Sequence, residues 1–308
     1  MKRMNRVEFG KELMALANEY DFIILNPDTK SCGLEVFGEI YPERNFTFGI
    51  AEQNLMAAAS GVASCGEKVF LSTFAVFASM RACEQVRTFI CYPNLNVTIL
   101  ASHGGLSTGA DGASHIAIED IGIMRTFPNM TIVEPSDFIA AKKLVKKALD
   151  FKGPLYIRFP KISTPQIHDI NNYDIEIGKG NVILDYGNDA TIIVTGWLLY
   201  KVLEAAKILK DDNIFVRVIE MHTIKPIDQN LIIKAAKETK GIVTVEDHSI
   251  IGGLGSAVCE IISEYMPTKL KRIGIEDRFG ESGDAEELYA KNHMTVDDIV
   301  KAVKLVRE

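Results

Sequence analysis

The stretch ILASHGGLSTGADGASHIAIEDIGIMR, residues 99–125, starts as an apolar β-strand and continues as a polar loop. The strand ends at His103, and four glycines in the next nine residues give the loop unusual backbone freedom. Asp111 and His115 lie four residues apart within that loop. In proteins that alternate strands and helices, ligands bind in loops at the carboxyl ends of the strands. The stretch therefore predicts an α/β fold in which the functional residues follow the strands.

The chain on both sides of this stretch alternates between strand-like and helix-like segments. Apolar runs rich in β-branched and aromatic residues occupy 22–25, 68–73, 97–102, 131–135 and 154–159. Helix-like runs lie between them, and Ser136 with Asp137 forms an N-cap signal ahead of the amphipathic segment FIAAKKLVKKALD (138–150). This alternation predicts a mostly parallel sheet with helices on both faces.

The alternation stops between Pro160 and Asp189, where the sequence is rich in Asn, Asp, Pro and Gly and has no helical period. Strand-like runs with helix-like runs between them resume at 190–196, 213–220, 241–247 and 271–276. We therefore expect two doubly wound sheet domains, residues 1–162 and 186–308, joined by a linker over 163–185.

Composition excludes several classes of protein. The 308 residues are 47% hydrophobic and 24% charged, which is typical of a globular protein rather than a disordered or fibrous one. The net charge of −7 gives no basic surface for nucleic acid. The basic N-terminus MKRMNRVEFG lacks an apolar segment behind it, and no window approaches the roughly 20 apolar residues of a membrane span, so we expect a cytoplasmic protein without a membrane partner. The five scattered cysteines form no C-x-x-C pair and are expected to be reduced thiols rather than metal ligands.

Two glycine-containing motifs have simpler explanations than ligand binding. GGLGS (252–256) follows a strand, but Val258 stands where a dinucleotide-binding motif needs a small residue, so tight turns and close helix packing explain these glycines better. ADG (110–112) and GDA (283–285) are incomplete versions of the G-D-G that begins a magnesium-diphosphate signature. The sequence therefore contains no complete motif for binding a diphosphate.

Taken together with FGIAEQN (48–54) and STFAVFASMRACEQVR (72–87), the loop after His103 resembles the transketolase family of thiamine-diphosphate enzymes. The pattern D-G-x-x-H-x-x-x-E-D, followed by M-R and by FPNMTIVEPSD (127–137), is similar to the family's pyrimidine-binding domain. The second half resembles the transketolase carboxy-terminal domain. The resemblance implies transfer of a two-carbon ketol unit between sugar phosphates with thiamine diphosphate as cofactor.

The missing G-D-G motif acquires a meaning through this resemblance. Members of the family hold the cofactor's diphosphate through Mg²⁺ (or Ca²⁺) bound by G-D-G and a downstream Asn on an amino-terminal domain. The sequence thus resembles the carboxy-terminal subunit of a split transketolase, whose partner, an amino-terminal subunit, supplies that half of the site. The resemblance implies an α2β2 heterotetramer and a single chain that is inactive alone.

The resemblance also implies roles for cofactor-binding residues. Glu52 matches the catalytic glutamate that hydrogen-bonds the aminopyrimidine ring of the cofactor and favours its imino tautomer. Phe74 and Phe77 match the aromatic residues on which that ring stacks. Asp28 matches an acidic residue near the thiazolium ring, and Met80 stands where transketolases often have Tyr.

A second set of residues is implied to bind the sugar phosphate. His103 and His115 match catalytic histidines that meet the sugar's oxygens and phosphate, and imidazole suits proton transfer because its pKa lies near neutrality. Asp111 matches the residue that recognises the substrate's hydroxyl group next to its carbonyl. Arg158 and Arg6 match arginines that clamp a terminal phosphate.

The loop around these residues departs from the family's common G-E-D-G-P-T-H, because Ala110, Ala113 and Ser114 replace Glu, Pro and Thr. The individual donor and acceptor sugars therefore stay open.

Other functions remain open on the sequence. The β subunit of a 2-oxoacid dehydrogenase has the same two-domain layout with a glutamate and stacking aromatic residues, but His103, Asp111 and His115 suit a polyhydroxylated substrate better. A deoxyxylulose-phosphate synthase-like enzyme is less favoured because that family generally carries both halves on one chain. A non-catalytic scaffold subunit would bind no thiamine diphosphate.

Overall fold

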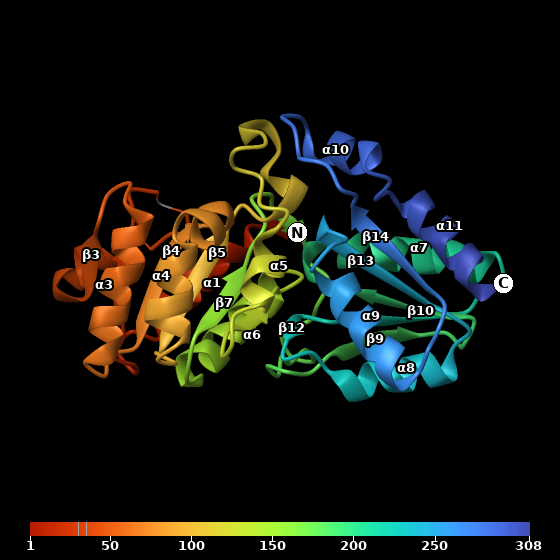
Figure 1. Ribbon diagram of the computed structural model, residues 1–308, viewed down its shortest axis with the longest axis horizontal. Helices are drawn as coiled ribbons and strands as arrows, with labels where there is room; N and C mark the ends of the chain where they lie inside the picture. The colour runs from red at the N-terminus through yellow and green to blue at the C-terminus, as the bar shows by residue number, and fades with distance from the viewer. Residues whose placement is uncertain (30, 35) are drawn as a thin grey trace.

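The computed structural model describes residues 1–29, 31–34 and 36–308, and it contains one large β-sheet in each half of the chain (Figure 1). The first sheet has seven strands in the order β12-β6-β7-β5-β4-β2-β3. Its pairs are parallel, except that β12 runs antiparallel to β6. The strands are β2 (Ile23–Asn26), β3 (Asn45–Thr47), β4 (Val69–Phe74), β5 (Val97–Ser102), β6 (Thr131–Val133), β7 (Leu155–Arg158) and β12 (Thr223–Lys225).

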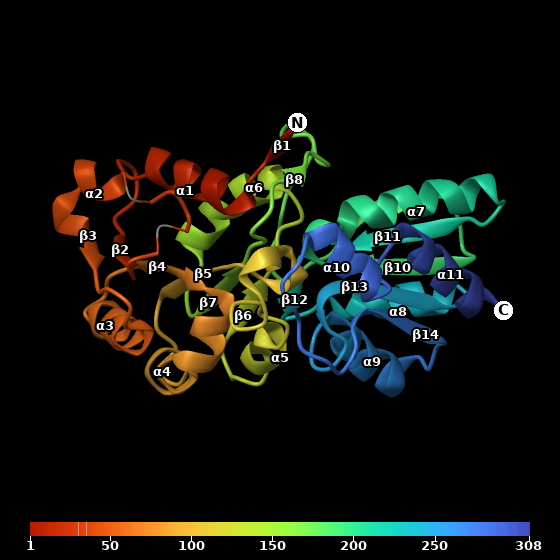
Figure 2. The same cartoon turned by 90° about the horizontal axis from the view of Figure 1, so that it is seen from above.

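Helices cover both faces of the first sheet (Figure 2). One face carries α1 (Asn5–Ala15), α2 (Phe37–Ile40) and α6 (Phe138–Asp150). The other carries α3 (Glu52–Ser64), the π-helical η2 (Phe77–Arg81), α4 (Cys83–Gln85), the π-helical η3 (Val86–Cys91) and α5 (Asp120–Arg125). A separate apolar core fills each side, with Phe9 and Leu144 in one and Leu55 and Ile90 in the other. The predicted start of α6 is confirmed, because the Asp137 carboxylate accepts a hydrogen bond of 2.8 Å from Ala140 N.

The second sheet has the order β14-β13-β10-β11-β9, parallel except for the antiparallel β9. Its strands are β9 (Asn181–Asp185), β10 (Ala190–Val194), β11 (Val216–Glu220), β13 (Ile242–Ser249) and β14 (Leu270–Ile275). Around it lie η5 (Gly196–Leu198), α7 (Leu199–Asp211), α8 (Gln229–Glu238), α9 (Leu254–Tyr265), α10 (Ala285–Lys291) and α11 (Val296–Arg307). Helices α7 and α11 pack together, as do α8 and α9, so both faces are covered. The expectation of two doubly wound α/β sheets is confirmed.

The segment expected to be an irregular linker, 163–185, contains two strands. β8 (Thr164–Pro165) pairs with β1 (Lys2–Arg3), and β9 forms an edge of the second sheet. In addition, β12 belongs to the second half of the chain by sequence but pairs with β6 in the first sheet. β8 and β12 have only two and three residues, and β9 lies in the segment rich in Asn, Asp, Pro and Gly, so the sequence gives none of them the long apolar run that predicts a buried strand.

A buried ion network lies where the two halves meet. Arg158, the last residue of β7, donates from Nε to Asp120 at 2.8 Å and from Nη1 to Glu134 at 2.6 Å. Its Nη2 reaches across to the backbone oxygen of Asp247 in β13 at 3.1 Å, and its guanidinium lies 5.3 Å from the Trp197 ring centre. All of these side chains are at most 2% exposed. The network therefore joins the two halves through a fully enclosed cation.

None of the helices in the described parts of the chain is both long and apolar enough to cross a bilayer.

We expect Arg158→Met to lower the free energy of unfolding by about 3–5 kcal/mol, because it leaves two buried carboxylates without their counter-ion. Urea denaturation measures this change. The matched control is Lys304→Met, which breaks the exposed pair between Lys304 and Asp212 (2.7 Å) and should change stability by less than about 1 kcal/mol. Equal stabilities for the two variants would show that the network does not hold the halves together.

Candidate active site

Four aromatic rings from three segments meet at the carboxyl ends of β4 and β5. Phe74 is the last residue of β4 and Phe77 begins η2; their ring centroids lie 5.7 Å apart and the planes are 20° from parallel. The His103 ring lies 3.9 Å from that of Phe74, and the His115 ring lies 5.4 Å from that of Phe77. Because β4 and β5 are parallel neighbours, with Phe74 opposite Ser102, residues that follow them arrive at one place.

Glu52 lies beside this cluster as the first residue of α3, with 2% of its surface exposed. Its Oε2 accepts a hydrogen bond of 2.9 Å from Nη1 of Arg81, at the end of η2. The Arg81 guanidinium also lies over the Phe77 ring, 4.0 Å from its centre. A planar cation thus stacks on an aromatic face while it donates to a buried carboxylate. Sequence reasoning missed Arg81, although its position one helical turn after Phe77 could have placed the two side chains together.

His103 is a buried, neutral imidazole with a strained backbone. Its φ of +63° lies in the left-handed region, and its Nδ1 is 2.9 Å from the hydroxyl of Ser102. Burial lowers the pKa of His103 to about 3, and the nearby cations Arg6 and Lys161 disfavour its charged form further. At neutral pH the ring therefore acts through hydrogen bonds rather than through a charge.

Asp111 lies at the rim of the site and is paired with a residue that sequence reasoning missed. Nζ of Lys161 donates to Asp111 Oδ1 at 2.7 Å, and both side chains are about one-third exposed. This hydrogen bond lowers the pKa of Asp111. Lys161 follows β7 by three residues and lies 50 residues from its partner in the sequence, so no local pattern links the two. His115, which is half-buried, has its Nδ1 2.9 Å from the Ser114 hydroxyl.

The two arginines expected to clamp a phosphate are placed very differently. Arg6, in α1, lies close enough to His103 to affect its pKa, and its guanidinium donates to the backbone oxygens of Ser31 (2.7 Å), Pro160 (3.0 Å) and Lys161 (2.6 Å). The structure does not bring Arg158 to the site, because its side chain is completely buried and all three of its nitrogens donate to protein acceptors. In this structure the Arg158 guanidinium is therefore held by the protein itself, away from the ring cluster.

Asp28 is an exposed residue that follows the end of β2 by two positions. It lines a hollow of about 320 Å³ together with Ser31, Asn45 and Ser72. Because β2 and β4 are parallel neighbours, this hollow opens at the same edge of the sheet as the cluster.

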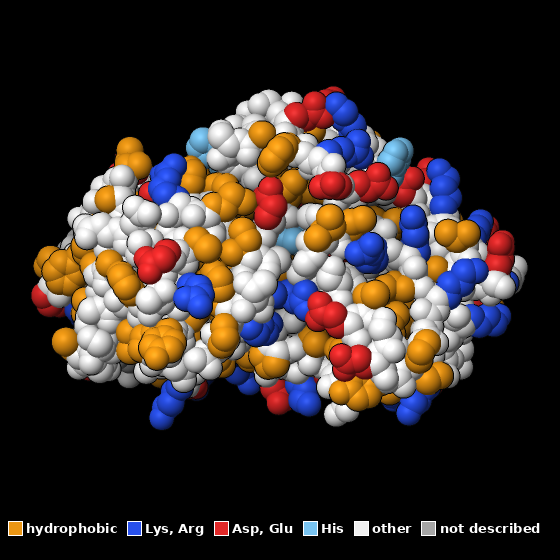
Figure 3. Space-filling view, in the orientation of Figure 1, with side chains coloured by type: hydrophobic (Ala, Val, Ile, Leu, Met, Phe, Trp, Pro, Cys, Tyr) orange, Lys and Arg blue, Asp and Glu red, His pale blue; other side chains and the backbone are white. Residues whose placement is uncertain are grey.

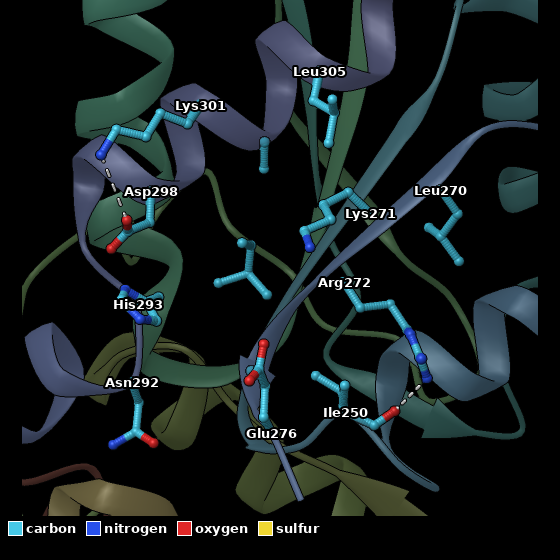
Figure 4. Close-up of a pocket in the computed structure, with 13 residues that line it drawn as sticks. Ile250, Leu270, Lys271, Arg272, Glu276, Asn292, His293, Asp298, Lys301 and Leu305 are labelled. Atoms are coloured by element: carbon cyan, nitrogen blue, oxygen red, sulfur yellow. Dashed lines mark hydrogen bonds and ion pairs between the residues drawn. The ribbon is translucent and has the colours of Figure 1, made fainter.

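A larger hollow of about 430 Å³ lies in the second half of the chain, between β14 and α11 (Figure 4). Lys271, Glu276, His293 and Lys301 line it, and Arg272 donates to the Ile250 backbone oxygen at 2.7 Å at one side. The site residues expected from the sequence all lie elsewhere. Within 1–29, 31–34 and 36–308 there is no group of three or more His, Cys, Asp or Glu side chains placed to hold a metal ion.

Two large apolar side chains next to Glu52 and Arg81 in the sequence are exposed. Ile50, two residues before Glu52, is 74% exposed, and Met80, next to Arg81, is 40% exposed. On the face drawn in Figure 3, larger hydrophobic patches lie over the half of the molecule with the first sheet, and charged side chains crowd the other half. Exposed apolar patches of this kind mark surfaces that bind other proteins.

Comparison with known proteins relates both halves of the chain to one family. The family described as "Transketolase, pyrimidine binding domain" matches residues 4–166, and "Transketolase, C-terminal domain" matches residues 178–299. A chain of Methanocaldococcus jannaschii named as a transketolase C-terminal section is 44% identical, with 97% of this chain and 94% of that one covered. One subunit of the apulose-4-phosphate transketolase of Phocaeicola vulgatus is 37% identical, with 98% and 97% covered. A solved structure of a split-gene transketolase, an inactive β4 tetramer, superposes with a TM-score of 0.91 at 43% identity, with 99% of this chain and 98% of that one covered.

The depressed pKa of His103 predicts a specific pH dependence of stability. An unfolded histidine takes up a proton near pH 6.5, whereas folded His103 stays neutral to about pH 3, so stability is lost as the pH falls below 6.5. We expect His103→Gln to remove roughly 1 kcal/mol of this loss for each pH unit below 6.5, measured as free energies of unfolding at pH 7 and pH 5. NMR signals of the His103 ring, identified by their absence in the variant, should not move between pH 8 and 5. A titration midpoint near 6.5 would contradict the prediction.

Proposed function

The chain belongs to the transketolase family, and from this we propose that it is one subunit of a two-chain transketolase that transfers a two-carbon ketol unit between sugar phosphates. It supplies the aminopyrimidine side of a thiamine-diphosphate site and the residues that bind the sugar. The observation that carries this proposal is the convergence of a buried carboxylate, two stacked phenylalanines and two histidines at the carboxyl ends of β4 and β5.

The residues present fit the aminopyrimidine ring of thiamine diphosphate. The Arg81 guanidinium, which is flat, cationic and rich in N–H groups, already lies on Phe77 and donates to Glu52. An aminopyrimidine is also flat and carries N–H groups, so Phe74 and Phe77 would hold its face and Glu52 would hold a proton at a ring nitrogen. When bound, thiamine diphosphate would supply a nucleophilic carbon for chemistry at the ketose carbonyl. Asp28 faces the same edge of the sheet and is proposed to lie near the thiazolium ring.

The sugar phosphate is proposed to lie among His103, His115 and Asp111. Neutral His103 exchanges hydrogen bonds with hydroxyl and carbonyl oxygens, and Asp111 reads a hydroxyl. We propose Lys161, rather than Arg158, as the exposed cation that meets the phosphate. Arg6 adds positive charge, and its hydrogen bonds to the backbone oxygens of Pro160 and Lys161 hold that cation in place.

A partner chain is proposed to complete the site. This chain covers 97% of a relative that is itself named as one subunit of a transketolase, which supports an arrangement in two subunits. Exposed Ile50 and Met80 flank the pair formed by Glu52 and Arg81, so a partner docked there would bury the cofactor between the chains. We propose that an amino-terminal subunit binds the diphosphate through G-D-G and Mg²⁺ in an α2β2 assembly. The single chain is then inactive, as is the β4 form of the split-gene relative.

The direct test is to produce the chain together with a G-D-G-containing chain encoded beside it and to assay the complex with thiamine diphosphate and Mg²⁺. We expect ketol transfer between sugar phosphates by the complex and none by the single chain. Oxidative decarboxylation of pyruvate instead would indicate a 2-oxoacid dehydrogenase subunit. A complex that binds no thiamine diphosphate in calorimetry would indicate a scaffold.

Glu52→Gln should lower kcat of the complex about 10²–10⁴-fold, because the amide cannot hold the proton at the pyrimidine nitrogen. Calorimetry should show a much smaller change in cofactor affinity, since the stacking phenylalanines remain. Glu84→Gln, an exposed glutamate on nearby α4, is the matched control and should keep the wild-type rate. A wild-type rate in Glu52→Gln would refute the assignment.

Arg81→Ala should tighten binding of thiamine diphosphate to the complex, by up to about five-fold. The Arg81 guanidinium must leave Glu52 and Phe77 before the ring binds, and partly exposed ion pairs contribute about 0.2–1 kcal/mol. Calorimetric titration of the complex measures the change, with exposed Arg87→Ala as control. Weaker binding in Arg81→Ala would mean that Arg81 contacts the bound cofactor instead of being displaced by it.

A further inference from the structure

The loop that carries His103, Asp111 and His115 is held by a carboxylate of the other domain. Asp247, in β13, is 2% exposed and accepts hydrogen bonds from two backbone amides of this loop. Its Oδ1 is 2.8 Å from Leu106 N and its Oδ2 is 3.2 Å from Ser107 N. These amides begin the 3-10 helical turn η4 (Gly105–Asp111), where backbone N–H groups have no partner within the turn.

The Asp247 carboxylate is itself fixed within the second domain. The indole nitrogen of Trp197 donates to Oδ2 at 3.1 Å, and the hydroxyl of Tyr289 donates to the same oxygen at 2.8 Å. Both donors are at most 1% exposed, and they also contact one another at 3.0 Å. The carboxylate therefore presents its oxygens to the loop in a geometry that the second domain determines.

The loop approaches Asp247 so closely that glycine is required. A Cβ on Gly105, whose φ is +62°, would lie 2.2 Å from the carboxyl carbon of Asp247. At the far end of the loop, a Cβ on Gly112 would lie 2.5 Å from Oγ of Ser282. Two of the glycines in this loop thus allow contact with the second domain.

Hydrogen bonds link the residues that follow Leu106 to the backbone of the site residues. The hydroxyl of Thr108 donates to the backbone oxygen of His103 at 2.8 Å. The hydroxyl of Ser107 donates to Gly104 O at 2.6 Å and accepts from the backbone N–H of Lys161 at 3.0 Å. Fixing residues 106 and 107 therefore fixes the backbone on both sides of the sugar-binding region.

We propose that Asp247 is a positioning residue for the sugar half of the site, through which the carboxy-terminal domain sets the geometry of the His103–His115 loop. This inference rests on the proposed function only for the identity of the ligand. Asp247 does not touch the cofactor or the substrate; it acts through the amides of Leu106 and Ser107. Glu52, Phe74 and Phe77 lie on α3, β4 and η2, so cofactor binding should not depend on it.

The test is Asp247→Asn in the complex with its partner. The Asn side chain has the same shape as the Asp247 carboxylate. Its NH2 group replaces one accepting oxygen and cannot accept a hydrogen bond from the donors that surround Asp247. Displacement of site groups by about 1 Å can reduce rates 10²-fold, so we expect KM for the sugar phosphates to rise and kcat to fall, each about ten-fold or more. The dissociation constant of thiamine diphosphate should stay within two-fold of wild type. Hydrogen exchange of the amides in 105–112 should become faster.

Glu246→Gln is the matched control on the same strand. Glu246 is also fully buried and accepts from two backbone amides, Leu254 N at 2.6 Å and Gly255 N at 2.8 Å, but these begin α9 rather than the site loop. It should lower the melting temperature comparably while KM and exchange in 105–112 stay at wild-type values. Tyr289→Phe, which removes one donor to Asp247, should shift KM in the same direction by a smaller factor and serves if Asp247→Asn does not fold.

Two outcomes overturn the proposal: wild-type KM and exchange in Asp247→Asn, or the same KM change in Glu246→Gln. A failure of the proposed function is distinguishable from these outcomes, because the wild-type complex would then show no ketol transfer. In that case faster exchange of 105–112 in Asp247→Asn, but not in Glu246→Gln, would still show that the carboxylate holds the loop.

Discussion

The buried guanidinium of Arg158 is the interaction on which the placement of both domains depends. A charge enclosed in protein is destabilising by several kcal/mol unless every N–H group has an acceptor. The acceptors here belong to separate segments: Asp120 and Glu134 in the first domain and the backbone of Asp247 in the second. They must converge around one cation, and the site loop converges with them, because Gly104 packs so tightly on the guanidinium that a Cβ would lie 2.8 Å from it. Electrostatics in the core therefore set the geometry of the loop that follows His103.

The proposed cofactor half of the site follows a different rule, because its buried carboxylate is paired with a cation of the same chain. Glu52 is almost completely buried, and an unpaired carboxylate there would be costly. Arg81 removes that cost, and its guanidinium gains further from the face of Phe77. The Glu52 carboxylate is thus paired within this chain. Asp247 holds the proposed sugar half through backbone amides, whereas the Arg81 side chain lies on the proposed cofactor half.

Sequence patterns were sufficient for the parallel strands, because strand-like and helix-like runs alternate clearly along the chain, whereas the expectation that Glu52 lies with the phenylalanine rings came from the resemblance to the transketolase family. They failed where contacts span long distances along the chain. Asp247 meets the site loop from 141 residues away and Lys161 meets Asp111 from 50, so no local motif contains either pair. Arg158 faces Asp120 and Glu134, and an arginine at a strand end has the same sequence signature whether it faces a ligand or a buried carboxylate. The short strands β9 and β12 also give no clear signal, because β12 has only three residues and β9 lies in a segment rich in Asn, Asp, Pro and Gly.

The exchange of β12 into the first sheet has a consequence for how genes of this type can be rearranged. This strand belongs by sequence to the second domain, yet its ladder partner is β6, and Lys225 reaches the backbone oxygens of Arg125 and Phe127 in the first. Recombination between the two domains would leave the backbone groups at the edge of β6 without the pairing strand β12. It would also remove the hydrogen bonds that Lys225 donates to the first domain. A chain divided between the two domains would therefore lose hydrogen bonds that the first sheet makes with the second half of the chain, even though the sequence between them resembles an ordinary linker.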